Sequence, residues 1–173
     1  MNILLVYPRY PDTFWSFKHA LKFISKKAAY PPLGLLTVAS MLPTHWKKKL
    51  IDMNIDNLND ADISWADYVF ISAMAVQQQS VRDVVARSNQ QDVKIVAGGP
   101  LFATDHEQHQ QFNGVDHFVL GEGEAIVARL VADLENGTAQ HLYRSDVRPD
   151  IRKSPAPDWN LIDTRKYATL TVQ

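Results

Sequence analysis

Small residues follow three apolar runs of this 173-residue sequence, at positions where a ligand could approach the backbone closely. They are Ser72-Ala73-Met74, Gly98-Gly99-Pro100 and Gly121-Glu122. Glycine has no Cβ, so its backbone can lie against a ligand or adopt a positive φ. A tight strand-to-helix turn also selects glycine, and at any single position that interpretation is equally good. The three groups together favour a ligand site over turns alone.

The apolar runs before these residues predict the strands of a parallel sheet. Strands are expected at residues 3–7, 49–53, 68–72, 94–97 and 117–120. Helical spacing predicts helices at 32–42, 78–88, 104–112 and 124–136, with a short turn at 60–66. Strands that alternate with helices form right-handed βαβ units. The sequence therefore predicts an α/β fold, a Rossmann-like or flavodoxin-like doubly wound sheet of five strands in the order 2-1-3-4-5.

The predicted sheet brings the small residues to one edge. In an open parallel sheet, ligands bind beyond the carboxyl ends of the strands, where the strand order changes. The loop after the first strand, which contains Arg9 and Tyr10, is expected at the same edge. We therefore expect one binding site, formed by Arg9, Tyr10 and the three groups of small residues.

The sequence lacks the motifs of the common phosphate sites. No G-x-G-x-x-G follows the first strand, and no G-x-x-x-x-G-K-[ST] occurs anywhere. The third strand ends in Ser72 and not in the aspartate of a phospho-receiver. A long, mostly neutral ligand group along the strand ends is the remaining option.

Two other groups of polar residues have simple structural explanations. Glu122 and Glu124 begin a predicted helix, where the helix dipole favours carboxylates, so we expect a cap first and ligand contact second. His106 and His109 are three residues apart and not four as in H-E-x-x-H, and polar neighbours surround them. A solvated helix face explains these histidines better than a metal site.

Composition excludes several classes of function. The sequence has no cysteine, which removes disulfides, thiol nucleophiles and iron–sulfur ligation from it. The net charge is −1 and the basic residues are scattered, so nucleic acid is not an expected partner. No apolar run is long enough to span a membrane or to form a signal peptide, and we expect a cytoplasmic chain.

Two segments do not fit a minimal five-strand domain. Residues 8–31 form a long connection after the first strand, rich in aromatic residues. These residues fill a satellite core, cover a ligand or form a surface for a further domain. These aromatics include Tyr10, Phe14, Trp15 and Phe17. Residues 151–173 are expected to be a linker, ending at 167–173 in the start of a strand that has nothing to pair with. The predicted binding domain therefore covers residues 1–150, and the linker leads into a further domain.

Five stretches carry a resemblance to a known family. They are ILLVYPRYPDTFWSFKHALKFISKKAAYPPLGLLTVASMLP at 3–43, WADYVFISAMAVQQQSV at 65–81, KIVAGGPLF at 94–102, VDHFVLGEGE at 115–124 and PAPDWNLID at 155–163. The chain resembles the cobalamin-binding domains at the front of radical-SAM enzymes, in the branch of the hopanoid C-2 methylases. The resemblance extends over nearly the whole chain.

The resemblance implies a cofactor, a site and a partner. Cobalamin would bind with its dimethylbenzimidazole tail swung away from cobalt and inserted beside the strand-end residues. A downstream radical-SAM domain would hold a [4Fe–4S] cluster on three cysteines and bind S-adenosylmethionine. Methylcobalamin could then deliver a methyl group to a hopanoid-type or related lipid, while this fragment alone would not be catalytic.

The loop after the first strand departs from the pattern of many cobalamin domains. These domains have Asp-x-His-x-x-Gly there, and the histidine is the lower ligand of cobalt. Here the loop is Pro8-Arg9-Tyr10-Pro11-Asp12, and the nearest histidine is His19. The branch is thought to bind cobalamin without that histidine. The alternative is a degenerate Rossmann-like interaction or small-ligand domain that no longer binds cobalamin.

Overall fold

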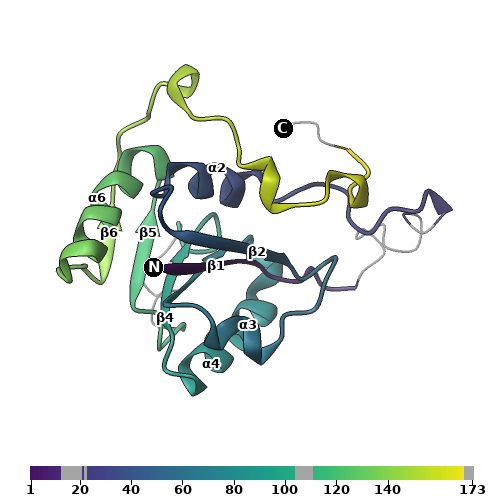
Figure 1. Ribbon diagram of the computed structural model, residues 1–173, viewed down its shortest axis with the longest axis horizontal. Helices are drawn as coiled ribbons and strands as arrows, with labels where there is room; N and C mark the ends of the chain where they lie inside the picture. The colour runs from purple at the N-terminus through teal and green to yellow at the C-terminus, as the bar shows by residue number, and fades with distance from the viewer. Residues whose placement is uncertain (13–20, 22, 104–110, 170–173) are drawn as a thin grey trace.

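A single parallel sheet organises the chain. The computed structural model describes residues 1–12, 21, 23–103 and 111–169. Its six strands lie in the order β2-β1-β3-β4-β5-β6 (Figure 1). They are β1 (Asn2–Tyr7), β2 (Lys47–Asp52), β3 (Tyr68–Ser72), β4 (Lys94–Gly98), β5 (His117–Leu120) and β6 (Leu142–Arg144). The predicted α/β class and the order of the first five strands are confirmed, and a sixth strand extends the sheet.

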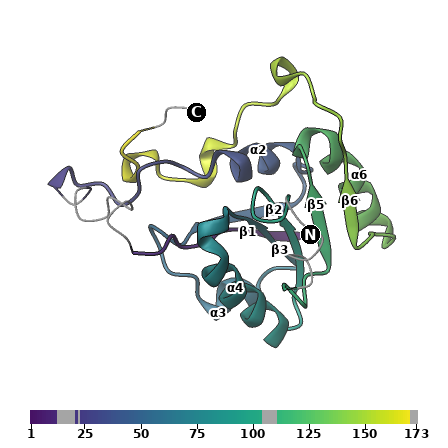
Figure 2. The ribbon, with the colours of Figure 1, turned by 180° about the vertical axis from the view of Figure 1, so that it is seen from behind.

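Helices cover both faces of the sheet. Figures 1 and 2 show α2 (Leu33–Met41) and α6 (Gly123–Asn136) on one face, and α3 (Asp60–Ser64) and α4 (Gln78–Gln90) on the other. Short 3-10 turns are η2 (Ala75–Gln77), η3 (Ile151–Lys153), η4 (Trp159–Leu161) and η5 (Thr164–Lys166). Among the described helices, none has the length and apolar composition that a membrane crossing needs. Most of the helix predicted at 104–112 lies outside the described residues, as do Phe14, Trp15 and Phe17.

The side chains of β1 show why this sheet needs two helix layers. Ile3 and Leu5 belong to the apolar core beneath α2 and α6, whereas Leu4 and Val6 belong to the core beneath α3 and α4. All four side chains are fully buried. Successive side chains of a strand point to opposite faces, so a strand covered on both faces is a continuous apolar run.

The two edge strands differ most from the sequence prediction. β2 starts two residues before the predicted 49–53, and its first half alternates between exposed and half-buried lysines. Lysines on an edge strand discourage pairing with other chains. β6 was not predicted because it has only three residues, of which Tyr143 alone is buried. The Tyr143 hydroxyl donates to Asp133 Oδ2 at 2.8 Å, which ties this short strand to α6.

The C-terminal segment, predicted to be a linker, runs alongside α2 in both views (Figures 1 and 2). The backbone N–H of Asp158 donates to the Leu36 carbonyl of α2 at 3.0 Å. The Asp158 carboxylate lies 3.4 Å from Lys48 Nζ, and both side chains are largely buried. α2 has no charged residue, which fits a helix covered by the sheet on one side and by this segment on the other.

The expectation that the strand at 167–173 lacks a partner is wrong for its described part. Tyr167 forms a parallel bridge with Ala28. The Ala168 N–H donates to the Ala28 carbonyl at 2.9 Å, and the Lys27 N–H donates to the Lys166 carbonyl at 2.8 Å. The long connection after β1 supplies this pairing edge, which lies outside the main sheet and could not be foreseen from strand order.

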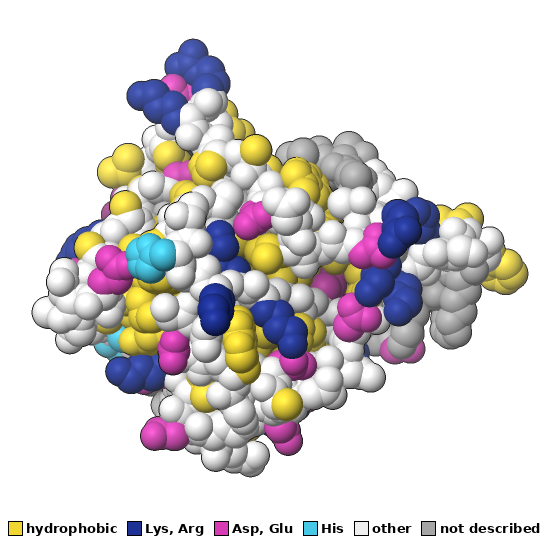
Figure 3. All heavy atoms as spheres, in the orientation of Figure 1, with side chains coloured by type: hydrophobic (Ala, Val, Ile, Leu, Met, Phe, Trp, Pro, Cys, Tyr) yellow, Lys and Arg dark blue, Asp and Glu magenta, His cyan; other side chains and the backbone are white. Residues whose placement is uncertain are grey.

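Charged side chains intermingle on the face seen in Figure 3. Lysines and arginines stand beside aspartates and glutamates there. One group of ion pairs joins the C-terminal segment to the connection after β1, because Asp56 accepts from Lys166 Nζ at 2.9 Å and lies 3.8 Å from Lys27 Nζ. These pairs are partly exposed, so each contributes about 1 kcal/mol or less.

Candidate functional site

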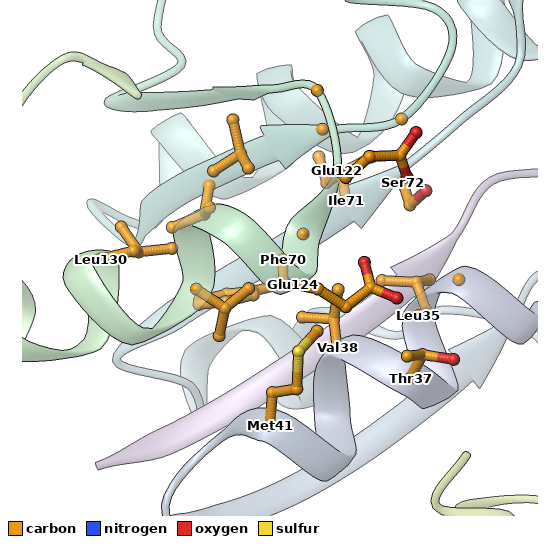
Figure 4. A pocket seen from close by; sticks show the side chains of 18 of the residues that line it. Leu35, Thr37, Val38, Met41, Phe70, Ile71, Ser72, Glu122, Glu124 and Leu130 are labelled. Carbon is orange, nitrogen blue, oxygen red and sulfur yellow. The ribbon is translucent and has the colours of Figure 1, made fainter. Parts of the chain in front are cut away.

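A cavity of about 410 Å³ lies between α2 and α6, over the carboxyl-terminal halves of β3, β4 and β5 (Figure 4). Helix α2 contributes Gly34, Leu35, Thr37, Val38 and Met41, and α6 with its preceding loop contributes Gly121, Glu122, Gly123, Glu124, Val127 and Leu130. The strands and the loop after β4 contribute Phe70, Ile71, Ser72, Val96, Gly98, Gly99, Pro100, Ala103 and Val119. Cavities of this size and apolar character are typical of small-molecule and cofactor sites.

Glycines shape the gap between the two helices. A Cβ at Gly123 would lie 3.4 Å from Val38 Cγ2 and 3.5 Å from Met41 Cε, which are ordinary van der Waals distances, so the first turn of α6 lies close to α2 there. A Cβ at Gly34 would meet no atom within 4 Å. Gly34 therefore borders open space at the cavity, where a ligand could approach the start of α2 closely.

Two of the predicted strand-end glycines are required by the backbone itself. Gly99 has a φ of +90°, and a Cβ there would lie 2.7 Å from Ser72 Oγ and 3.0 Å from the Ala73 nitrogen. Gly121 has a φ of +102°, and its Cβ would overlap the Ser145 carbonyl oxygen. The turn explanation therefore suffices for these two glycines, and their position beside the cavity is an additional property.

The structure brings together some of the predicted site residues and separates others. Those that line the cavity are Ser72, Gly98, Gly99, Pro100, Gly121 and Glu122. Those that do not are Ala73, Met74, Arg9 and Tyr10. Ala73 is only 1% exposed, because the turn at Gly99 packs directly against it.

Arg9 and Tyr10 lie at the same edge of the sheet but turn toward β2 and α4. The Arg9 N–H donates to Ser80 Oγ at 2.9 Å, and its Nε donates to the Met53 carbonyl at 3.2 Å. The Tyr10 N–H donates to Asn54 Oδ1 at 2.8 Å. These contacts hold the loop after β1 in a fixed course beside the cavity and not inside it.

The hydroxyl of Tyr10 belongs to a chain of polar contacts above β1 and β3. It lies 2.6 Å from the Tyr7 hydroxyl and donates to Met74 Sδ at 3.3 Å. Burial raises the pKa of Tyr7 far above its usual value, so its phenol stays protonated. Met74 itself is 46% exposed. This group offers a neutral, partly apolar surface next to the cavity mouth.

A buried carboxylate, Asp52, lies at the end of β2. Its Oδ1 accepts from the N–H of Asn54 at 2.9 Å and from Asn54 Nδ2 at 2.8 Å, an Asx-type turn. Its Oδ2 accepts from the Tyr167 hydroxyl at 3.1 Å. Burial raises the pKa of Asp52, and these hydrogen bonds only partly oppose that effect. Asp52 thus fixes the turn after β2 and the C-terminal segment together.

Two carboxylates stand at the mouth of the cavity. Glu124, in the first turn of α6, accepts from Ser154 Oγ of the C-terminal segment at 2.5 Å. Glu122 occupies the N-cap position of α6, but its side chain makes no capping hydrogen bond, so the expected side-chain cap is wrong for this residue. Its exposed carboxylate is consequently available to a ligand.

Comparison with known proteins identifies the family. Residues 23–131 match the family described as the B12 binding domain. The chain belongs to the B12-binding domain family. B12 is cobalamin, so the resemblance seen in the sequence is confirmed at this level.

Two curated relatives align over essentially the whole chain. An uncharacterized methyltransferase of Synechocystis sp. is 36% identical over 173 residues, which are 100% of this chain and 32% of the relative. A hopanoid C-2 methylase of Rhodopseudomonas palustris is 31% identical over 174 residues, which are 99% of this chain and 33% of the relative. The chain thus spans about a third of the length of either relative.

The cavity fits the nucleotide tail of cobalamin. The tail ends in a flat, largely apolar benzimidazole, and most of the cavity wall consists of aliphatic side chains and Phe70. Within the described part of the chain, no three His, Asp or Glu residues are placed to hold a metal ion. His106 and His109 lie outside the described residues.

Proposed function

We propose that this domain holds methylcobalamin, with the nucleotide tail in the cavity between α2 and α6, for methyl transfer by a longer radical-SAM enzyme. The names of both relatives support the reaction class, since one is a methyltransferase and the other a methylase. Both are about three times as long as this chain, which leaves room for a catalytic domain. The hopanoid C-2 methylase suggests a hopanoid-type or related lipid as substrate class.

One observation carries the proposal, namely the apolar cavity that opens at the carboxyl edge of the sheet. Its mouth contains residues predicted from the sequence at three neighbouring strand ends, Ser72, Gly98 and Gly121. Its inner part is bounded by two helices that no prediction had placed together. An apolar slot of this kind at the strand ends suits a flat group inserted from above the sheet.

Different residues around the cavity would contact different parts of the cofactor. Aliphatic side chains of α2 and α6 would cover the tail and exclude water from it. The hydroxyls of Ser72 and Thr37 and the carboxylate of Glu122 would face the polar parts of the nucleotide at the mouth. Arg9, Tyr10, Ala73 and Met74 would contact the cofactor only outside the cavity, above β1 and β3.

The domain itself would bind and orient and would not catalyse. When bound, methylcobalamin supplies a transferable methyl group. The [4Fe–4S] cluster and the S-adenosylmethionine would be held by the partner domain, because this sequence has no cysteine to ligate a cluster. We further propose that residues 1–150 form the binding domain and that residues 151–173 lead into that partner.

Reconstitution with hydroxocobalamin tests the proposal. The protein is incubated with the cofactor and desalted, and the retained corrin is quantified from its absorption spectrum. We expect stoichiometric retention. If neither this chain nor the longer protein retains corrin, the proposal is wrong.

A second candidate follows from the loop after β1. Residues 8–12 of this loop include no histidine, and the Tyr10 hydroxyl is engaged by Tyr7 and Met74. A domain that kept the fold but lost the cofactor would not need the cavity. It would retain no corrin, and a bulky side chain placed in the cavity would leave the activity of the longer protein unchanged.

A further inference from the structure

We propose that the inner end of the cavity selects the base of the cofactor's nucleotide tail and favours a benzimidazole over a purine. Cobamides share the corrin ring and differ in this base. The inference rests on the proposed function, because it takes the tail to occupy the cavity between α2 and α6. It concerns which cobamide the domain accepts, which family membership does not specify.

Polar side chains are confined to the mouth of the cavity. The helices of βαβ units run antiparallel to the strands, so the first turns of α2 and α6 lie at the carboxyl edge of the sheet. The polar side chains that line the cavity come from the first two turns of these helices or from the ends of the strands, and they are Thr37, Ser72, Glu122 and Glu124. Figure 4 shows Ser72 and Glu122 together at one end of the cavity, away from Leu130.

The inner wall is apolar throughout the described residues. It consists of Val38 and Met41 from α2, Phe70 and Val96 from the sheet, and Val127 and Leu130 from α6. Phe70 and Val96 are register partners inside the sheet, and their backbone groups belong to the β3–β4 ladder. In the middle of both helices the backbone groups are likewise used within the helices. An inserted base would find no hydrogen-bond partner among the side chains of this wall.

This wall discriminates between bases by their edges. The outer edge of dimethylbenzimidazole carries only C–H and methyl groups, which match aliphatic side chains. Adenine adds an amino group and two further ring nitrogens, which would lose their hydrogen bonds to water without replacement. One such unpaired buried group weakens binding by roughly tenfold to a hundredfold. The cavity should therefore bind an adenine-tailed cobamide at least about tenfold more weakly than cobalamin.

Equilibrium dialysis of the two cobamides tests the inference. Dissociation constants for hydroxocobalamin and for its adenine-tailed counterpart are measured on the same protein, with corrin absorbance as the readout. The ratio of the two constants does not depend on the fraction of folded protein, because unfolded protein lowers the apparent affinity for both cobamides by the same factor. We expect a ratio of about ten or more in favour of cobalamin.

Met41 provides a matched pair of variants. Met41→Gln keeps the length of the side chain and adds an amide that can pair with the purine edge, so the ratio should fall severalfold. Met41→Leu changes the shape without adding a polar atom and should leave the ratio as in the original protein. Equal ratios in the two variants would overturn the assignment of this inner wall as the surface that selects the base.

The possible outcomes separate this inference from the proposed function. Tight binding of both cobamides with equal affinity, or a preference for adenine, overturns base selection and leaves cobalamin binding intact. Binding of neither cobamide overturns both proposals. Preference for cobalamin that weakens in Met41→Gln supports them together.

Discussion

The Tyr167 hydroxyl donates a hydrogen bond to Asp52 Oδ2 at 3.1 Å, joining residues that are 115 positions apart in the sequence. Both are buried, with 3% of Tyr167 and 5% of Asp52 exposed. The backbone of Tyr167 pairs at the same time with Ala28, in the connection between β1 and α2. The C-terminal segment is therefore fastened to the edge of the sheet at which the cavity opens.

Removing the Tyr167 hydroxyl should weaken this attachment. In Tyr167→Phe, the Asp52 carboxylate loses one buried hydrogen bond, and the free energy of unfolding should fall by about 1 kcal/mol or somewhat more. Urea denaturation followed by circular dichroism measures the change. Tyr30→Phe, at a tyrosine that is 50% exposed, is the matched control and should change stability little. Equal effects of the two variants would contradict the assigned role of Tyr167.

Asp52 should make stability depend on pH. Burial raises its pKa in the folded protein above that of the unfolded chain, which is about 4. The folded state therefore binds this proton more tightly, and the resulting stabilisation is complete below the unfolded pKa and is lost as pH rises through the folded pKa. Asp52→Asn cannot lose a proton, so its stability relative to the original protein should increase from about pH 4 upward and then level off.

Urea denaturation of the two proteins at a series of pH values measures that difference. Other titrating groups, including the neighbouring Asp56, are common to both proteins and cancel. A difference that does not change with pH, or one that shrinks as pH rises, would show that the Asp52 pKa is not raised.

Replacing two glycines beside the cavity by alanine should change the stability of the protein in opposite directions. Gly99→Ala forces a Cβ against Ser72 Oγ at a positive φ, which should lower the free energy of unfolding by roughly 1–3 kcal/mol. Gly34→Ala places a Cβ in open space within a helix and should raise it by up to about 1 kcal/mol. Thermal or urea unfolding of both variants checks the signs. If Gly99→Ala leaves the free energy of unfolding unchanged, the turn does not require glycine at this position. Close approach of a ligand would then be the remaining explanation.

Much of the fold follows from apolar runs in the sequence. The predicted bounds of β3 and β5 coincide with those observed, because both strands are largely buried apolar runs that directly follow an aspartate, Asp67 or Asp116. β6 was not predicted because it has a single buried side chain, Tyr143, which gives no periodic pattern. The pairing of Ala28 with Tyr167 depends on the three-dimensional course of a long connection, which local sequence does not encode.

The site was predictable at the strands and not at the helices. Parallel strands bring their carboxyl ends to one edge, so Ser72, Gly98 and Gly121 could be placed together in advance. On the helices, Gly34, Val38 and Met41 have the same spacing as Gly123, Val127 and Leu130. Any helix packed on a sheet shows this spacing, and only the sheet order reveals that the two helices face each other across a cavity.

Filling the cavity gives the most direct test of the central claim that the cofactor tail binds between α2 and α6. Val127 is buried and lines the cavity, whereas Ala128, its neighbour in α6, is exposed. Val127→Trp and Ala128→Trp therefore add the same side chain inside and outside the cavity. The measurement is the corrin retained from hydroxocobalamin after desalting, with circular dichroism to verify that both variants are folded. We predict stoichiometric retention by the original protein and by Ala128→Trp, and at least about tenfold weaker binding by Val127→Trp. Undiminished retention by a folded Val127→Trp would contradict the proposed site.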